Sequence, residues 1–415
     1  VRQAIGGLID ELLGQASADD GEAVDPSTLL ELVAVGNPIM HHLLLGLDPT
    51  PLGQSPFRLA VADPVEGPGS LIGLDRAGLR VHVGPCIAGH VGADTAAAIV
   101  HAGPHRSPTR RLLVDVGTNA EIVLGNEDGL LAASSPTGPA FEGAQISAGQ
   151  RATAGAIERV RIDRQTLEPR FRVIGVAPWS DDDDFAAALA RAGLAGPTGI
   201  CGSGIIEVVS ELFLAGVIDR DGVIGVPSGR ASPRLVPDGR TLRYELAEEV
   251  SVTQNDVRAI QLAKAALRAG IELLLDHAST RDVDEIQLAG AFGAQIDPVY
   301  AMVLGLVPDC PVDRVHPVGN AAGAGAVRAL LSTEQRRQMA EVAAGVTKIE
   351  TATEPSFQEH FVAALAFPHR DAPTPHLAAT IELPTPVADR AGATRSRQRR
   401  RRRERNPSAH GGAQQ

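Results

Sequence analysis

The residues best suited to chemistry lie in one polar turn between two apolar runs, RLLVDV (111–116) and EIVL (121–124). The runs predict the strands of a hairpin, and the polar residues of its turn are Gly117, Thr118 and Asn119. Such a turn presents backbone N–H groups and a hydroxyl to phosphate oxygens, which glycine allows to come close. Asp115, at the strand end, is placed to hold Mg²⁺ through water. A hairpin turn closed by an Asx-type hydrogen bond is the alternative interpretation.

A second glycine-bearing turn follows a strand predicted at 284–288. Its residues Gly290, Ala291 and Gly293 could let an adenine or a ribose lie against the backbone, because glycine adds no side chain there. A tight strand-to-helix turn would need the same residues. The local sequence therefore leaves both interpretations open.

A third stretch, Gly202, Ser203 and Gly204, opens a helix predicted at 205–214. Free N–H groups and the helix dipole favour an anion at such a helix start. The spacing of a Walker phosphate loop is absent, since no lysine follows. Close packing of the helix on a strand explains these small residues equally well.

Hydrophobic periodicity predicts the elements that must position these turns. The helix expected at 255–277 begins with a capping-box pattern formed by Thr253 and Asp256. Besides the hairpin, we expect strands at 157–162 and 171–176 and helices at 40–45 and 90–100. These elements predict an α/β fold.

The charge of the chain is unevenly distributed. The net charge is −12, although the stretch 395–405 contains eight arginines and a single glutamate, so the remainder is strongly acidic. Acidic proteins do not generally attract nucleic acid, so we expect no nucleic-acid partner. The arginines could tether an acidic partner, but an inert solvated extension is the favoured interpretation.

No apolar stretch of about 20 residues and no secretory signal pattern is present, so we expect no membrane contact and a cytoplasmic protein. Cys86, Cys201 and Cys310 are too widely spaced to predict a zinc or iron–sulfur site. We therefore expect buried free thiols.

The order of the three glycine-bearing stretches resembles the way in which acetate and sugar kinases, heat-shock chaperones and actin hold ATP. In that superfamily two lobes close on the nucleotide. The resemblance implies an actin-like ATPase fold, with ribonuclease H-like lobes built from mixed sheets flanked by helices.

Longer blocks resemble one branch of this superfamily, the reductive activators of corrinoid proteins. They recur in family order between about residues 30 and 335. They include VGNPIMHHLLLGLDPTPLGQSPF (35–57), GPCIAGHVGADTAAAI (84–99), LLVDVGTNAEIVL (112–124), GPAFEGAQISAGQRATAGAIE (138–158), GICGSGIIEVVSELFLAGVID (199–219) and LAGAFGAQIDP (288–298).

The resemblance implies an ATPase that drives the reduction of a Co(II) corrinoid to Co(I), with the electron supplied by a [2Fe–2S] ferredoxin-like domain. The partner would be a corrinoid protein or a corrinoid-dependent methyltransferase. Asp115 and the turn after it would form the second phosphate loop and the magnesium anchor, and residues 290–293 the adenosine wall. Asp94 and Glu142 would line the cleft, where a helix cap or a lobe-closing hydrogen bond is the alternative role for each.

The chain departs from this family in two respects. The ferredoxin cysteines are absent, and no Asp-x-Gly-Thr occurs within 1–110 to supply the first phosphate loop. We therefore expect an incomplete first lobe at 1–108, a second lobe with the phosphate and adenosine motifs at 109–369, and a disordered tail at 370–415. The chain would be a fragment of a longer activator that binds ATP weakly and turns it over slowly, since phosphoryl chemistry depends on positioning.

Two other functions remain open. A small-molecule kinase of the same superfamily would need a base near the terminal phosphate, for which Asp94 is the candidate. A degenerate module that binds a corrinoid protein without hydrolysing ATP would need no base. The oligomeric state is also open, with a homodimer among the states allowed.

Overall fold

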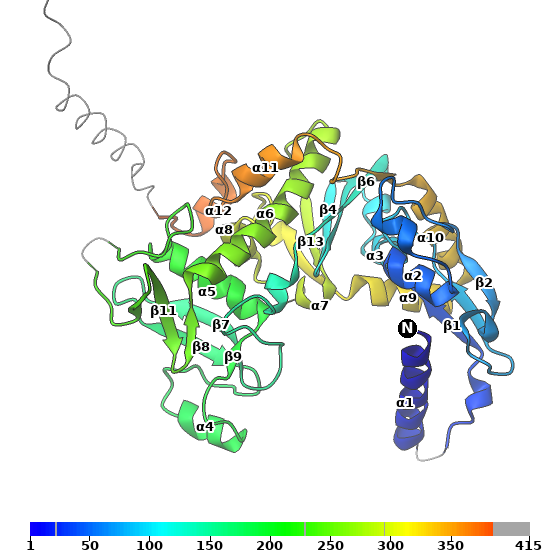
Figure 1. Ribbon diagram of the computed structural model, residues 1–415, viewed down its shortest axis with the longest axis horizontal. Helices are drawn as coiled ribbons and strands as arrows, with labels where there is room; N and C mark the ends of the chain where they lie inside the picture. The colour runs from blue at the N-terminus through cyan, green and yellow to red at the C-terminus, as the bar shows by residue number, and fades with distance from the viewer. Residues whose placement is uncertain (21–22, 228–229, 294, 385–415) are drawn as a thin grey trace, which may run out of the picture.

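The computed structural model describes residues 1–20, 23–227, 230–293 and 295–384 (Figure 1). Its helices are α1 (Arg2–Asp20), α2 (Pro38–Leu45), α3 (Ala93–Ala102), α4 (Phe185–Arg191), α5 (Gly202–Leu214), α6 (Gln254–His277), α7 (Gly290–Gly293), α8 (Pro298–Leu304), α9 (Ala321–Leu331), α10 (Thr333–Gly345), α11 (Phe357–Ala364) and α12 (Pro375–Thr380). Its strands are β1 (Glu31–Ala34), β2 (Val65–Pro68), β3 (Arg80–Val83), β4 (Arg111–Val116), β5 (Ala120–Asn126), β6 (Gly129–Ser135), β7 (Ala156–Ile162), β8 (Pro169–Val173), β9 (Gly199–Ile200), β10 (Leu235–Asp238), β11 (Thr241–Ala247), β12 (Val250–Val252), β13 (Glu285–Ala289), β14 (Val315–Gly319) and β15 (Thr347–Lys348).

A mixed sheet of six strands forms the centre, in the order β14-β13-β4-β5-β6-β15. The predicted hairpin is confirmed as β4 and β5, and a third antiparallel strand, β6, extends it. β13 runs parallel to β4, and β14 parallel to β13. Because successive side chains of a strand point to opposite faces, Leu112 and Val114 enter one core cluster and Leu113 enters another.

The helix α6 covers the first face of this sheet. It begins at the predicted capping box, in which Thr253 and Asp256 bond each other's backbone. A Cβ on its Gly270 would lie 2.6 Å from the end of the Ile122 side chain and 3.3 Å from Ser135, so a larger residue would displace these side chains or the helix. Ser135 Oγ adds a hydrogen bond of 2.6 Å to Ala266 O. The helix and sheet are thus held together by both packing and a polar contact.

The second face is covered by α3, α9 and α10, whose apolar residues share a core cluster with Leu113, Val123 and Ala132. A Cβ on Gly325 of α9 would lie 2.1 Å from the carbonyl oxygen of Ala97 in α3. This close contact joins α3 to an element from a much later part of the chain. The segment 104–110, a connector, links α3 to β4. The central sheet is therefore covered on both faces.

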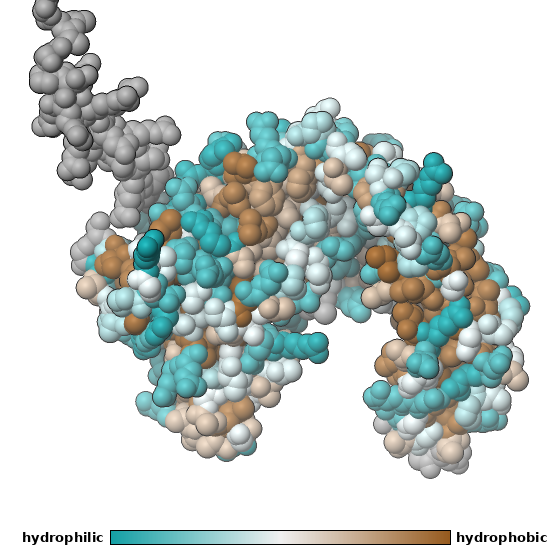
Figure 2. Space-filling model, viewed as in Figure 1, coloured by the Kyte–Doolittle hydropathy of each residue, from teal (hydrophilic) through white to brown (hydrophobic). Residues whose placement is uncertain are grey.

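Three smaller sheets surround the centre, in the orders β1-β3-β2, β8-β7-β9 and β10-β11-β12. The molecule has the shape of an arch, with β7, β8 and β11 in one arm and α1, β1 and β2 in the other (Figure 1). The space-filling view shows a wide hollow between the arms, and α7 borders it (Figure 2). Among the described helices, none has the length and hydropathy that a membrane span requires.

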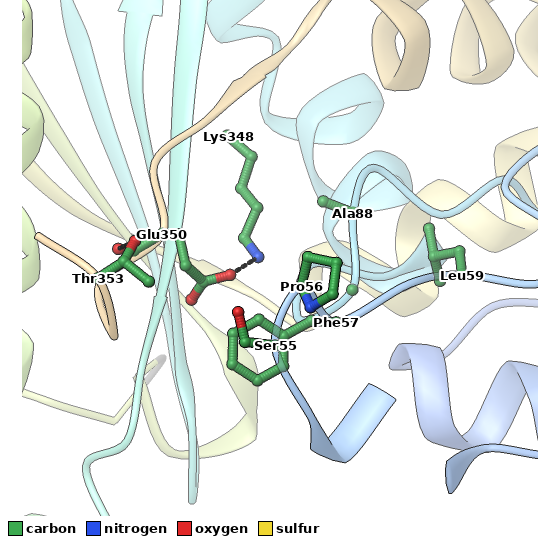
Figure 3. Close-up of a pocket in the computed structure, with 9 residues that line it drawn as sticks. Ser55, Pro56, Phe57, Leu59, Ala88, Lys348, Glu350 and Thr353 are labelled. Carbon is green, nitrogen blue, oxygen red and sulfur yellow. Dashed lines mark hydrogen bonds and ion pairs between the residues drawn. The ribbon is translucent and has the colours of Figure 1, made fainter. Parts of the chain in front are cut away.

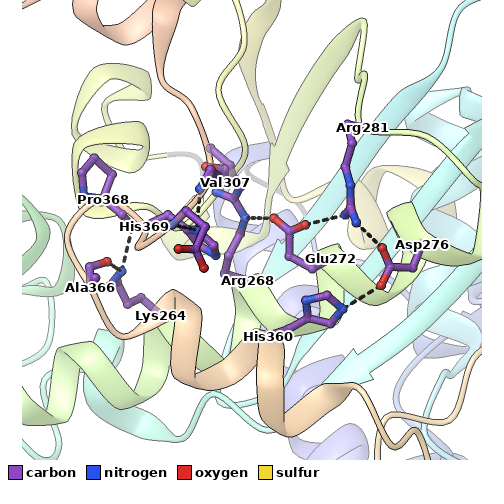
Figure 4. A network of polar contacts seen from close by, with 12 residues as sticks. Lys264, Arg268, Glu272, Asp276, Arg281, Val307, His360, Ala366, Pro368 and His369 are labelled. Atoms are coloured by element: carbon purple, nitrogen blue, oxygen red, sulfur yellow. Dashed lines mark hydrogen bonds and ion pairs between the residues drawn. The ribbon is translucent and has the colours of Figure 1, made fainter.

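The segment after α11 is held on α6 by buried polar contacts (Figure 4). Lys264 Nζ donates to Ala366 O at 2.6 Å and to Pro368 O at 2.9 Å. Arg268 donates to Glu272 at 2.8 Å and to Val307 O at 2.7 Å. Burial, and after it the charge of Arg268, holds the pKa of Lys264 well below its usual value. Two backbone carbonyls thus satisfy an amine that would otherwise be costly to bury.

The predicted start of the disordered tail at 370 is wrong. Residues 370–384 are folded, and α12 places Leu377 fully in the core. The N–H groups of His376 and Leu377 donate to the carboxylate of Asp309 at 2.8 and 2.9 Å, which caps this helix from a distant part of the chain. The remainder of the predicted tail, 385–415, lies outside the described residues.

Replacing Asp256 with alanine should destabilise the fold strongly. This buried carboxylate accepts four hydrogen bonds, from the N–H and hydroxyl groups of Ser147 and of Thr253. Because hydrogen bonds to a charged group are strong and their donors would lose a partner, we expect a loss of about 3 kcal/mol in the free energy of unfolding. Urea unfolding measures it. Asp238→Ala, at an exposed position of β10, is the control and should change stability by less than about 0.5 kcal/mol. Equal effects of the two variants would contradict this account.

Candidate functional site

Asp115 and Gly290 lie side by side at one edge of the central sheet. The parallel strands β4 and β13 end together there, with Ala289 in register with Asp115. Gly290 has a φ of +90°, and a Cβ on it would lie 2.5 Å from Asp115 Oδ1. Only glycine therefore fits at the end of β13, both for its backbone conformation and for its contact with this carboxylate.

The turn after β4 is held from one side. Thr137 Oγ1 donates to Gly117 O at 2.7 Å and to Thr118 O at 2.9 Å, and the N–H of Gly138 donates to Thr118 O at 2.9 Å. In a trans peptide the N–H points away from the C=O, so the N–H groups of Thr118 and Asn119 point away from Thr137. Two consecutive N–H groups with one orientation make a concave anion-binding arrangement.

Glu142 contacts this turn directly. It closes a short 3₁₀ turn, Pro139–Glu142, and is exposed. Thr118 Oγ1 donates to its Oε1 at 2.6 Å. The structure therefore brings Glu142 to the phosphate-loop candidate, where it fixes the threonine hydroxyl. Its catalytic role stays a prediction.

Asp94 reaches the same region from the first turn of α3. Its Oδ1 accepts the N–H of Thr95 at 2.8 Å, and burial raises its pKa. Burial and the nearby charge of Asp94 raise the pKa of Asp115 to about 6. The two carboxylates are thus electrostatic neighbours, although the connector 104–110 separates their elements.

Glu121 is a third carboxylate near Asp94 and Asp115, and the sequence did not predict it as a site residue. It stands opposite Asp115 in the β4–β5 pairing and accepts a hydrogen bond from Ser134 Oγ at 3.3 Å. Burial, followed by the charges of Asp94 and Asp115, raises its pKa to about 8. An acidic residue at the start of an otherwise apolar strand was the available signal. Glu121 becomes a candidate site residue only when the register of the hairpin is known, because that register places it opposite Asp115.

These three carboxylates (Asp94, Asp115 and Glu121) do not by themselves form a metal-binding site. In the part of the chain that is described, no three His, Cys, Asp or Glu side chains are grouped closely enough to hold a metal ion. Cys86, Cys201 and Cys310 are buried free thiols, as expected. Asp115 as a metal ligand therefore stays a prediction, with water as the remaining source of ligands.

The start of α5 is occupied by packing. Its residues Gly202, Ser203 and Gly204 are all buried. A Cβ on Gly204 would lie 2.3 Å from Ile157 O of β7, and Ser203 Oγ donates to Glu158 O at 3.2 Å. Helix–strand packing therefore accounts for these small residues, and their role as a phosphate site stays a prediction.

The second glycine-bearing turn forms the one-turn helix α7. Gly293 is buried, and a Cβ on it would lie 3.4 Å from the carbonyl carbon of Leu288, an ordinary contact. Ala291 belongs to α7 by its backbone, while its side chain lies outside the described residues. The adenosine-binding role of Gly290, Ala291 and Gly293 stays a prediction, although Gly290 adjoins Asp115.

Comparison with known proteins shows the family of this chain. Residues 109–378 match a family model described as the C-terminal domain of RACo, the ASKHA domain, and residues 1–107 match one described as the RACo middle region. The chain is 35% identical over 357 residues to the corrinoid activation enzyme RamQ of Eubacterium limosum, a match that covers 82% of this chain and 56% of RamQ. It is 26% identical over 302 residues to the [Co(II) methylated amine-specific corrinoid protein] reductase of Methanosarcina barkeri, covering 69% and 52% of the two chains.

A solved structure gives the same result. The reductive activator for corrinoid,iron-sulfur protein has a TM-score of 0.75 and 32% identity, over 92% of this chain and 58% of that one. The chain spans just over half the length of each of these proteins. The predicted actin-like α/β fold is confirmed by the ASKHA match and by this structural likeness. The chain belongs to the RACo family of reductive activators of corrinoid proteins.

Proposed function

We propose that this chain supplies the ATP-binding part of an activator that drives the reduction of a corrinoid protein from Co(II) to Co(I). The observation that carries the proposal is the meeting of Asp115, the turn after it and Gly290 at one sheet edge. The relatives support it, since their names describe corrinoid activation and the reduction of a Co(II) corrinoid protein.

ATP would bind at this edge of the sheet in one orientation. The adenosine would lie on the backbone of α7, where Gly290 has no side chain, and the phosphates would extend to the turn after β4. There the N–H groups of Thr118 and Asn119 point away from the Thr137 hydroxyl that holds the carbonyls. Glu142 would keep the Thr118 hydroxyl fixed, so that the turn binds phosphate without further ordering.

Magnesium suits the same place because its donors would be carboxylate oxygens and water. Burial raises the pKa of Asp94, Asp115 and Glu121, and for Asp115 and Glu121 repulsion by the neighbouring carboxylates raises it further. A nearby cation would relieve that repulsion, which supports a metal anchored by Asp115 through water. Bound magnesium neutralises charge on the reacting phosphates. Asp94 and Glu121 would orient water at that centre and accept its protons.

We assign residues 1–108 to the first lobe and 109–369 to the second, so that Asp94 and Asp115 face each other across a lobe junction. The electron would come from a [2Fe–2S] donor that these residues do not ligate, since the three cysteines are buried apart. The reductive half of the reaction therefore needs an electron source other than these residues, which provide the ATP-dependent half.

The function is tested with the chain, a Co(II) corrinoid protein, a reduced ferredoxin-type donor and Mg–ATP. We expect ATP-dependent Co(I) formation, followed by the Co(I) absorption band, and slow phosphate release that the corrinoid protein stimulates. Omission of ATP should prevent Co(I) from accumulating. Transfer of phosphate to a small molecule without any corrinoid would favour a kinase instead, and tight ATP binding with no hydrolysis would favour a degenerate module.

Gly290→Ala should weaken Mg–ATP binding at least about tenfold, because the new Cβ would displace Asp115 and strain the backbone. Gly129→Ala is the control, since Gly129 is exposed at the start of β6 and its Cβ would meet no atom within 4 Å. Calorimetric titration of both variants with Mg–ATP measures the difference. Equal affinities in the two variants would mean that ATP does not use this sheet edge.

Glu121→Gln should stabilise the protein at high pH and leave it nearly unchanged at low pH. The pKa of Glu121 rises from its ordinary 4.5 to about 8 on folding. The contribution of Glu121 to the stability of the fold is therefore full below about pH 4.5 and is lost as the pH rises through 8. At pH 9 we expect the variant to be more stable by about 2 kcal/mol, less than the full pKa shift implies.

Thermal unfolding between pH 5 and 9, without Mg²⁺, measures this difference. Glu341→Gln, at an exposed position of α10, is the control and should follow the unmodified chain at every pH. A Glu121→Gln variant that is destabilised at pH 9 would refute the electrostatic description of the cluster.

A further inference from the structure

A cavity of about 470 Å³ opens between the loop 55–59 and the segment 348–353 (Figure 3). Pro56 and Phe57 form an apolar wall from the first part of the chain. Lys348 and Glu350 form the opposite, charged wall from the segment after α10. Its size lies within the range of small-molecule sites, about 300–1,000 Å³.

The cavity is separate from the proposed nucleotide site. β15 pairs with β6, where Lys348 is in register with Ala132, and β5 lies between β6 and β4. Three strand spacings therefore separate Lys348 from the strand of Asp115, or about 14 Å, and two separate it from the strand of Glu121, or about 10 Å. The turn at residues 290–293, proposed to bind adenosine, lies on the other side of β4, at the end of β13. A ligand in the cavity would not occupy the adenosine position.

The charged wall has hydrogen-bonding capacity left for an anion. Lys348 Nζ forms an ion pair with Glu350, which uses one of its three donors. His90 Nδ1 lies 3.5 Å from the same carboxylate, a contact that is an ion pair only when the imidazole is protonated. The Lys348 ammonium also lies 5.9 Å from the ring centroid of Phe57. Donors for a ligand acceptor are therefore present beside an aromatic surface.

We propose that this cavity binds a small monocarboxylate with an aromatic or apolar body. The carboxylate would accept hydrogen bonds from Lys348 and from the Ser55 hydroxyl, and the body would pack on Phe57, Pro56 and Leu59. Such a ligand bridges the loop 55–59 and the segment 348–353, and it stabilises the arrangement in which these two parts are close. The site goes beyond the proposed ATPase function and does not depend on it.

The test compares benzoate with benzamide, which has the same body without the charge, by calorimetric titration of the full chain. We expect benzoate to bind at least about tenfold more tightly, because a charge-assisted hydrogen bond is lost with benzamide. Lys348→Gln should remove this difference, and Phe57→Ala should weaken both ligands. Arg337→Gln, an exposed base of α10 paired with Glu334 and Glu341, is the control and should leave benzoate binding unchanged.

Several outcomes would overturn the proposal. These are equal binding of benzoate and benzamide, unchanged benzoate affinity in Lys348→Gln, no benzoate binding at 10 mM or below, and complete displacement of benzoate by Mg–ATP. Inorganic phosphate that binds more tightly than benzoate would also overturn it, since the apolar wall would then have no part. Thermal unfolding of each variant confirms that the chain is folded, and Phe57→Leu replaces Phe57→Ala if the latter unfolds.

Discussion

The parallel pairing of β13 with β4 is the constraint on which the candidate site depends. It places Ala289 beside Asp115, so that the next residue, Gly290, must accommodate the carboxylate. A slip of one residue would turn Asp115 to the face on which Leu112 and Val114 pack in the core, so the polar residue at the strand end opposes such a slip. Packing of α6 and α3 on the two faces therefore also sets the position of the polar edge.

This edge of the sheet holds three acidic side chains whose ionised forms are disfavoured by burial. Asp94, Asp115 and Glu121 approach one another in buried surroundings, and each carboxyl is harder to ionise as a result. Asp256 is buried too, but four donors surround its carboxylate and anchor α6. The contrast separates two uses of buried acids. The carboxylate of Asp256 is satisfied by donors of the protein itself, whereas burial and neighbouring charges make the other three harder to ionise, as is common at functional sites.

The sequence predicted elements whose cause is local and missed those whose cause is distant. Strands β4 and β5 follow from apolar runs, and the start of α6 follows from Thr253 and Asp256. The sequence of the folded segment 370–384 shows no hydrophobic periodicity. The segment is held in place by contacts with Asp309 and with the core, which a local pattern does not reveal. Glu121 was missed for a related reason, since its partners are set by the pairing of strands.

Glycine patterns show where prediction of the site reaches its limit. Gly204 and Gly290 both exclude a Cβ, and both stand where a strand or loop passes into a helix. The atom that a Cβ would meet is a strand carbonyl at Gly204 and the carboxylate of Asp115 at Gly290. The first contact needs only close packing, while the second joins two segments that could face one ligand. The same local sequence pattern thus serves two purposes, and only the identity of the neighbour in space distinguishes a packing glycine from a candidate binding glycine.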